Sequence, residues 1–327
     1  MIPRYLLAAL ALAVLALTGC AMPQLNYEAK APTPSALKYV VTGTPAPKVF
    51  SLVDERRADG RIFHSGILPG EVKIDGAPID PVPFLATQLQ AELGSRGLPA
   101  QISDKATEPP AIRLKTYRMQ NMRTNAYTPF ITLTYISADV TTSDGGERRI
   151  GTFVTRGKTP MWRVDEPAVV EPIFTQPLAL GVQEFASKIA NITYGYRASD
   201  ETVKGLIAKI NGERTPNTFL DVYALGFTNN PAAIDTLVAL ARDPQEYVRQ
   251  AALSSLGNIG ATGHFGLLKS VYQDPAVSWQ DHSVALKAIA DLGTDESKAF
   301  IVEEAKRLGS SSAKEAPVLG QILALYL

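Results

Sequence analysis

Few side chains of this sequence are of a type that performs chemistry, and those few are widely separated. The chain has one cysteine, Cys20, and three histidines, His64, His264 and His282. A protein-bound metal ion needs cysteine, histidine or carboxylate ligands that converge on one point, and no two of the histidines have the spacing of a ligand pair. The sequence therefore predicts no metal site, and we expect the histidines to be ordinary surface or partly buried residues.

The sequence also lacks a catalytic loop of a familiar type. It contains no Gly-x-Ser-x-Gly motif of a serine hydrolase. The segment from Gly151 to Thr159 is close to a phosphate-binding loop, but five residues rather than four separate its glycines, and Pro160 follows where a helix should begin. We therefore predict no cofactor and a protein that is not an enzyme. The enzymatic alternative is a hydrolase whose site is assembled from scattered carboxylates.

The sequence around Cys20 points to a definite modification. After a short basic start, Tyr5 to Leu17 form an apolar run, and the run ends in Leu17-Thr18-Gly19-Cys20. The run has 13 residues, whereas a membrane-spanning helix needs about 20, so it is typical of a signal peptide. Its last four residues resemble the lipobox of bacterial lipoprotein precursors. The resemblance implies cleavage between Gly19 and Cys20, a diacylglycerol on the Cys20 sulfur, and an acyl chain such as palmitate on the new amine.

The lipobox also implies a location. Two or more acyl chains anchor a protein stably, whereas a single chain is marginal. Ala21 follows the cysteine, and not the aspartate that often signals inner-membrane retention in enteric bacteria. The resemblance therefore implies the outer membrane, with the body facing the periplasm. The alternatives are a cleaved secretory signal without lipidation and a buried N-terminal helix.

Composition and pattern divide the chain into four parts. Hydrophobic residues make up 46% and charged residues 20% of the chain, which is ordinary for a globular protein with a core. The formal net charge is zero and gives no argument for nucleic acid. We predict a signal peptide (1–19), a lipidated flexible tether rich in Pro, Ala and Thr (20–47), an α/β domain (48–195) and a helical repeat domain (196–327).

Alternating and helical patterns in residues 48–195 predict an α+β domain, in which two helices cover one face of a small, mostly antiparallel sheet. The expected elements are a strand (49–53), a short hairpin near 72–74, a helix (80–97), strands (111–119, 130–142 and 148–155) and a second helix (177–192). Asp54 to Arg61 is expected to be a solvated loop with local ion pairs. Met119, Met122, Met161 and Trp162 are expected in the core, and an apolar groove for a lipid tail is the alternative.

This order of elements behind a lipobox resembles a group of small periplasmic α/β lipoproteins. The group includes the lipopolysaccharide-assembly lipoprotein and auxiliary lipoproteins of some ABC transport systems. One local match, Val53-Asp54-Glu55-Arg56, follows the first strand. The resemblance implies a role in lipid or lipopolysaccharide handling, but it carries no ligand-binding residue over to this chain.

A repeated pattern begins after Thr215. Leu-Gly pairs recur at intervals of 31 and 36 residues (225–226, 256–257 and 292–293), and Asp-Pro pairs recur at an interval of 31 residues (243–244 and 274–275). The segment from Asp243 to Gly257 (DPQEYVRQAALSSLG) resembles a HEAT-type repeat. The resemblance implies an all-α HEAT-like solenoid of about three helical pairs, with a last helix (313–327) as a cap.

The repeat turns supply the predicted partner-binding residues. Repeat stacks bind through extended surfaces, so we predict that Asp243, Arg249 and Asp274 contact a protein partner. Ala285 stands where the next repeat should match Arg249, which breaks any continuous Asp–Arg ladder.

The sequence therefore predicts a non-enzymatic, membrane-anchored periplasmic lipoprotein that acts as an adaptor for protein partners. Its second partner is the outer-membrane bilayer, reached through acylated Cys20. The alternative function is an auxiliary role in lipid or lipopolysaccharide transport and assembly.

Overall fold

The computed structural model describes residues 25–40, 48–68, 70–105, 108, 110–123, 125, 128–159 and 167–327. The predicted signal peptide, Cys20 and the cleavage position lie outside these residues. Within them, no helix is both long enough and apolar enough to cross a membrane.

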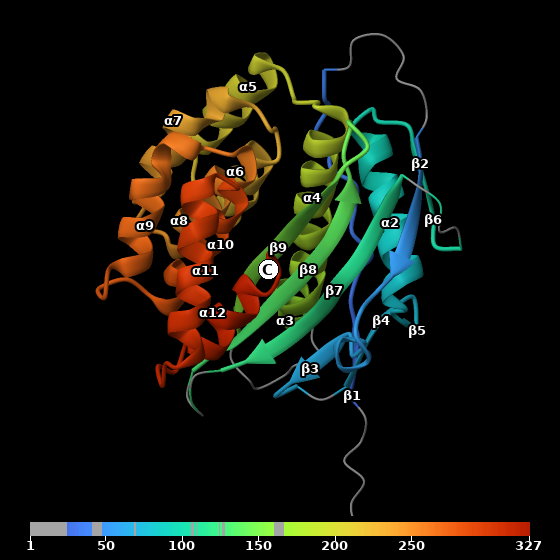
Figure 1. Cartoon of the computed structure of the whole chain (residues 1–327), viewed down its shortest axis with the longest axis horizontal. Helices are drawn as coiled ribbons and strands as arrows, with labels where there is room; N and C mark the ends of the chain where they lie inside the picture. Colours follow the sequence, from blue (N-terminus) through green and yellow to red (C-terminus); the bar gives the residue numbers. More distant parts are fainter. Residues whose placement is uncertain are drawn as a thin grey trace, which may run out of the picture.

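A six-stranded sheet forms the centre of the N-terminal half (Figure 1). Its strand order is β6-β2-β7-β8-β9, and β3 pairs with the far end of β7. The strands are β2 (Lys48–Asp54), β3 (His64–Gly66), β6 (Ala100–Ser103), β7 (Ala111–Met122), β8 (Phe130–Thr141) and β9 (Glu147–Thr159).

The sheet is mixed, which corrects the prediction of a mostly antiparallel one. The long strands β7, β8 and β9 are antiparallel neighbours, whereas β2 is parallel to both β6 and β7. Parallel neighbours need a long crossover, and helix α2 (Pro81–Ser95) supplies it between β2 and β6. The short strand β6 had not been predicted.

Helices α2 and α4 (Gln176–Ile189) pack against one another and against the sheet, as predicted. Leu85, Leu89 and Leu93 of α2 are fully buried at helical spacing. The helix is followed by Gly97 with φ 89°, a left-handed residue that suits glycine. One short helix and two π-helical turns flank α4, namely α3 (Pro167–Val170), η2 (Glu171–Thr175) and η3 (Ala190–Tyr194).

Residues 25–40 are ordered against the body, although they fall in the predicted flexible tether. Strand β1 (Leu25–Glu28) pairs in parallel with β4 (Gly70–Ile74), which forms the predicted hairpin with β5 (Ala77–Pro78). The Tyr27 ring is buried and stacks on Phe174, with ring centroids 4.7 Å apart. The Tyr39 hydroxyl donates to the carbonyl oxygen of Phe227 at 2.7 Å. Buried aromatic side chains therefore fix a segment whose composition suggested a tether.

Two rows of helices form the C-terminal half. Helices α6, α8, α10 and α12 contact one another in sequence, and we call them the inner row; α5, α7, α9 and α11 are the outer helices. Their bounds are α5 (Asp200–Asn211), α6 (Thr218–Gly226), α7 (Ile234–Leu240), α8 (Glu246–Ile259), α9 (Phe265–Gln273), α10 (Trp279–Leu292), α11 (Asp295–Gly309) and α12 (Ala316–Leu323), with short 3-10 turns at η4 (Pro231–Ala233) and η5 (Thr262–His264). A further 3-10 turn, η1 (Ala58–Gly60), lies after β2 in the N-terminal half.

The recurring glycines explain the close spacing of the inner row. A Cβ on Gly226 would lie 2.4 Å from the Ser255 Cβ, and a Cβ on Gly257 would lie 2.5 Å from the Ala288 Cα. Real Cβ atoms do not approach other atoms so closely, so the first two Leu-Gly pairs mark places where neighbouring helices touch.

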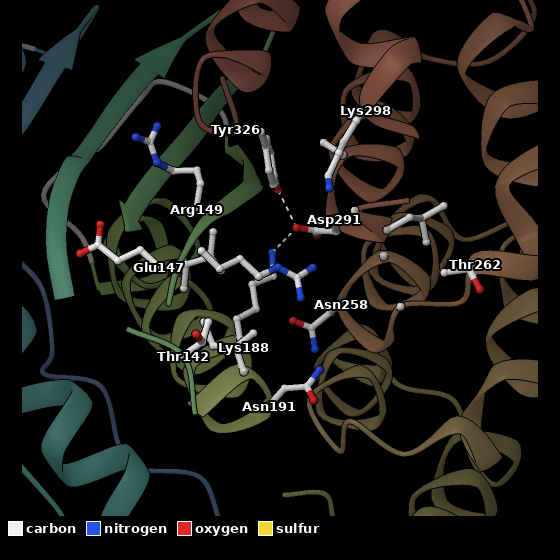
Figure 2. A pocket seen from close by; sticks show the side chains of 18 of the residues that line it. Thr142, Glu147, Arg149, Lys188, Asn191, Asn258, Thr262, Asp291, Lys298 and Tyr326 are labelled. Carbon is white, nitrogen blue, oxygen red and sulfur yellow. Dashed lines mark hydrogen bonds and ion pairs between the residues drawn. The ribbon is translucent and has the colours of Figure 1, made fainter. Parts of the chain in front are cut away.

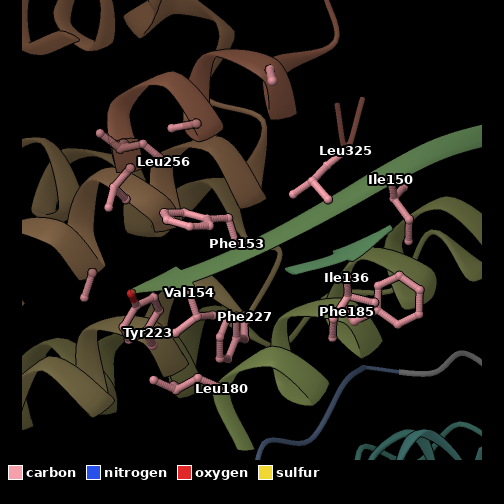
Figure 3. Packing of buried hydrophobic residues seen from close by; sticks show 14 of the residues in the cluster. Ile136, Ile150, Phe153, Val154, Leu180, Phe185, Tyr223, Phe227, Leu256 and Leu325 are labelled. Carbon is pink, nitrogen blue, oxygen red and sulfur yellow. The ribbon is translucent and has the colours of Figure 1, made fainter. Parts of the chain in front are cut away.

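The inner row packs on the sheet, and the two halves share one hydrophobic core. Figure 3 shows Phe153 of β9 directed toward Leu256 of α8, with Tyr223 and Phe227 of α6 close to Val154. The face that a free stack of repeats would offer to a partner is therefore covered by the chain's own sheet.

Arg156 strengthens this junction from the sheet side. Its guanidinium lies 4.0 Å from the ring centroid of Phe219 and 4.1 Å from that of Tyr247, one ring from α6 and the other from α8. Its Nε donates to Gln176 Oε1 at 2.8 Å. A buried guanidinium between two aromatic rings combines cation–π attraction with apolar packing.

We expect Arg156→Ala to lower the free energy of unfolding by about 2 kcal/mol, because it removes a desolvated cation–π contact and leaves the two rings without their partner. Urea unfolding followed by near-ultraviolet circular dichroism measures the change. Arg57→Ala is the control, because the Arg57 side chain is 90% exposed. Equal midpoints for the two variants would show that the Arg156 contact does not stabilise the junction.

Candidate functional site

A cleft of about 790 Å³ opens where the sheet meets the inner row (Figure 2). One wall is the turn and first residues of the β8–β9 hairpin, and the other is formed by the C-terminal ends of α8 and α10 with the start of α11. The end of α4 and the Tyr326 ring close the base. The side chains and backbone that line the cleft include Asp144, Glu147, Arg148, Arg149, Ile150, Lys188, Ile192, Asn258, Thr262, Asp291, Leu292, Gly293, Lys298, Ile301 and Tyr326.

Four buried charges form a closed ring at the base of the cleft. Lys188 Nζ lies 2.9 Å from Glu184 Oε1 and 2.6 Å from Asp291 Oδ1. Lys287 Nζ lies 2.7 Å from Glu184 Oε1 and 2.9 Å from Asp291 Oδ2. Each ammonium thus contacts both carboxylates, and the side chains are between 0% and 7% exposed. We call these four residues the charge ring.

The charge ring joins the two halves of the chain. Glu184 and Lys188 come from α4 on the sheet, whereas Lys287 and Asp291 come from α10. Lys188 also donates to the carbonyl oxygen of Gly151 in β9. Tyr326 Oη lies 2.8 Å from Asp291 Oδ1, so the C-terminal segment is tied to the same carboxylate (Figure 2).

Burial and pairing act against each other in the charge ring. Burial is the largest effect on the Lys188 ammonium and lowers its pKa, although the Asp291 and Glu184 carboxylates act to raise it. Burial raises the pKa of the Asp291 carboxyl, but Lys188 and Lys287 outweigh burial and hold that pKa below its ordinary value. Burial lowers the pKa of the Lys287 ammonium, but Asp291 and Glu184 outweigh it and raise that pKa. Burial together with the Asp291 and Glu184 carboxylates raises the pKa of the Tyr326 hydroxyl.

This arrangement suits cohesion better than catalysis. A general acid that works near neutral pH needs a raised carboxyl pKa, and the pKa of Asp291 is lowered. Lys188 Nζ is engaged by the Glu184 and Asp291 carboxylates and by the Gly151 carbonyl oxygen. Among the residues that the structure describes, no group of three or more His, Cys, Asp or Glu side chains is placed to hold a metal ion.

The rim of the cleft carries two cations of a different kind. Arg148 and Lys298 are exposed and have no hydrogen-bond or ion-pair partner in the described part of the chain. Their charged neighbours are paired, since Arg149 binds Asp139 and Glu147 accepts from Arg113 at 2.7 Å. Asp144, exposed on the hairpin turn, accepts only from Thr142 and from the Gly146 amide among the described residues. Two unpaired cations thus stand against one unpaired carboxylate, and the balance of the rim is positive.

The predicted partner-binding residues lie away from the cleft, in the repeat turns. Arg249 Nη1 donates to the Asp243 carbonyl oxygen at 2.8 Å, and its Nη2 lies 2.9 Å from Asp281 Oδ2. The Asp243 carboxylate accepts from the Gln245 amide at 2.9 Å and pairs with Arg214. These side chains link consecutive turns, so their polar groups are already engaged within the protein, and partner binding by them stays a prediction.

The link to the next repeat uses Asp281 and not position 285. Helix α8 begins three residues after Asp243, whereas α10 begins five residues after Asp274, and Asp281 in the first turn of α10 pairs with the Arg249 guanidinium. Asp274 itself is exposed, and its carboxylate accepts from the Ala276 amide at 2.9 Å.

The three histidines are far apart, as expected from their spacing. His64 lies between the Gly70 carbonyl oxygen, 3.0 Å from Nδ1, and Asn121. His282 lies 2.8 Å from the Asp274 carbonyl oxygen and 3.3 Å from Glu315. His64 and His282 are each held by their own surroundings rather than by a shared ligand.

Two other sequence motifs can now be placed. The segment from Gly151 to Thr159 lies within strand β9 and not in a loop, so it is no phosphate-binding loop. The loop after β2 has the expected local ion pair, Asp54 to Arg56 at 2.8 Å, and Glu55 also reaches Lys115 of β7 at 2.5 Å.

Sequence reasoning missed the charge ring. A signal was present, because Glu184–Lys188 and Lys287–Asp291 are opposite charges spaced i,i+4 among apolar residues of two helices. The same spacing is common on solvated helix faces, so only the tertiary structure shows that these charges are buried and face one another.

Comparison with known proteins supports the repeat module. The family model for HEAT repeats matches residues 222–290, which confirms the predicted HEAT-like repeats there. Among solved structures, the chain is similar to the complex of CpcE and CpcF of phycocyanin lyase from Nostoc sp. PCC7120, with 19% identity and a TM-score of 0.25, over 45% of this chain and 75% of that chain. A TM-score this low carries no argument about function. No curated protein matches the chain.

The closed geometry of the charge ring predicts strong coupling between its members. We expect Lys287→Met and Glu184→Gln each to destabilise the protein by about 3–5 kcal/mol, because each leaves a buried charge incompletely paired. The double variant keeps the Lys188–Asp291 pair, so its cost should fall short of the sum of the single costs by about 0.5–3 kcal/mol. Urea unfolding of the four proteins measures the coupling. Strict additivity would show that the ring is not a unit.

The lowered carboxyl pKa values predict acid sensitivity. Paired lysines lower the folded-state pKa of Asp291 below its ordinary value of 3.8, and Arg149 lowers that of Asp139. The unfolded chain therefore binds these protons first, and the stabilisation present above about pH 4 is lost as the pH falls through the folded-state pKa values. We expect urea midpoints to change little from about pH 7 to about pH 5 and to drop below about pH 4. A midpoint that rises on acidification would contradict this assignment.

Proposed function

We propose that this protein is a non-enzymatic, lipid-anchored adaptor on the periplasmic face of the outer membrane, and that it holds a protein partner. The observation that carries the proposal is the open cleft at the junction between the HEAT repeats and the sheet. HEAT-type modules bind through extended surfaces, and the inner row of this chain is covered by the sheet. The cleft and the outer helices are therefore the surfaces left for a partner.

A rigid junction supports an adaptor role. The charge ring and Arg156 fix the repeats on the sheet through contacts between distant parts of the chain. A partner bound in the cleft touches both halves, so its orientation relative to the anchored end is set by the fold.

The proposed anchor lies close to the body. Five peptide steps separate Cys20 from Leu25, the first residue of β1, and a fully extended chain of that length spans about 18 Å. A diacylglycerol and a palmitate on Cys20 would hold the ordered β1 end of the protein near the bilayer, since two or more acyl chains anchor stably.

Lipid or lipopolysaccharide handling is the alternative, and no observation favours it over the adaptor. Met119, one of the four side chains considered for an apolar groove, is fully buried in a small core with Phe130 and Phe174. Met161 and Trp162 lie outside the described residues. The carboxylate hydrolase is not favoured either, because Asp291 is locked by two lysines.

Replacing the anchor residue tests the proposal. Cys20→Ser should move the protein from the membrane fraction to the soluble fraction, because no thiol remains to carry the diacylglycerol. Fractionation of cells and intact mass of the purified protein measure this outcome. A Lys204→Ala variant, altered on the exposed surface of α5, should stay in the membrane fraction. A Cys20→Ser protein that stays there too, or a wild-type mass without fatty acids, would contradict the lipid anchor.

A further inference from the structure

We infer that the cleft binds an acidic peptide segment of the partner protein, with a carboxylate held between Arg148 and Lys298. The inference rests on the proposed protein-binding function and names the place and chemistry of that binding. It is independent of the lipid anchor.

The two rim cations supply the charge. Arg148 and Lys298 have no partner among the described residues, whereas the other lysine and arginine of the cleft, Lys188 and Arg149, are neutralised by carboxylates. Gly293 lets the Arg148 guanidinium lie against the end of α10, because a Cβ on this glycine would lie 2.8 Å from Arg148 Nη2. An anion entering the cleft thus meets one cation from β9 and one from α11.

One buried hydrogen-bond acceptor in the cleft, on Asn258, has no donor among the described residues. Asn258 is 6% exposed, and its Oδ1 has no hydrogen-bond partner in the described part of the chain. Its Nδ2 donates to the Gly226 carbonyl oxygen at 2.9 Å and to Ser187 Oγ at 3.0 Å, which fixes the amide orientation. Figure 2 shows Asn258 at the cleft wall, below Asp291. A buried acceptor without a donor is costly, and a backbone N–H of a bound segment can satisfy it.

These features favour a peptide over a phosphate group. A phosphate dianion offers acceptors almost exclusively, so it cannot donate to the unpaired Asn258 Oδ1. A peptide carries both the carboxylate and the N–H groups that the cleft walls require. Ile150, Ile192, Leu292 and Ile301 also line the cleft, so an apolar side chain beside the acidic one finds contacts.

Binding of short peptides tests the inference. The probe is a fluorescein-labelled pentapeptide of alternating leucine and glutamate, and the matched probe has glutamine in place of glutamate. Fluorescence anisotropy with the full mature protein should show tenfold or tighter binding of the glutamate probe, weakened by salt. Arg148→Ala combined with Lys298→Ala should reduce that binding about tenfold or more, the loss of about 1.4 kcal/mol. Lys204→Ala combined with Lys306→Ala removes two exposed lysines from the outer helices and should leave binding unchanged.

Three outcomes would overturn the inference. They are equal binding of the two probes, unchanged binding by the Arg148 and Lys298 double variant, and displacement of the glutamate probe by inorganic phosphate or phosphatidylglycerol vesicles at lower concentrations than by unlabelled peptide. The first two outcomes would show that the glutamate carboxylates or the two cations do not contribute to binding. The third would assign the cleft to a ligand that carries a phosphate group.

A photo-crosslinking residue separates this failure from failure of the adaptor proposal. It is placed at Thr262 in the cleft wall or at Lys204 on α5, both exposed. In native membranes, a partner trapped from Thr262 and released by excess glutamate peptide supports the inference. A partner trapped only from Lys204 overturns the cleft assignment but leaves the adaptor function, and no partner from either position contradicts the adaptor itself.

Discussion

The structure depends on the pairing of two buried lysines with two buried carboxylates. Isolated charges cannot remain ionised in an apolar interior without a large cost, so Glu184 and Lys188 of α4 require Lys287 and Asp291 of α10 as much as the reverse. Separating the two helices would break the Lys188–Asp291 and Lys287–Glu184 ion pairs, which join one helix to the other. The ring therefore fixes the position of the repeats on the sheet.

This constraint decides which surfaces are free. HEAT-type repeats are usually thought of as open stacks, but here β9 and α4 cover the inner row. Phe153 and Arg156 of β9 pack against its helices. What remains open is the cleft above the ring, where the two halves diverge. The cleft has a neutral, rigid base and a positive rim, and this contrast is the reason for assigning it an acidic segment of a partner.

Much of the local structure followed from the sequence. The helix from Pro81 ends as predicted beside Gly97. The sheet was predicted less well. Strands β1, β3 and β6 are only three or four residues long, and such segments pair in parallel with distant strands, so their own side chains give too little pattern to recognise. Tyr27 and Tyr39 likewise find partners far along the chain.

The sequence by itself determined the repeat period, since the first two Leu-Gly pairs mark where helices touch, and the type of most long elements, since each needs only its own apolar spacing. The tertiary structure alone decided which charges are buried together, which face of the repeats is covered and where a cleft remains. Lys188 and Asp291 are 103 positions apart, and the Tyr39 hydroxyl meets a carbonyl 188 positions away. No local pattern encodes such contacts, because they exist only after both halves of the chain have packed.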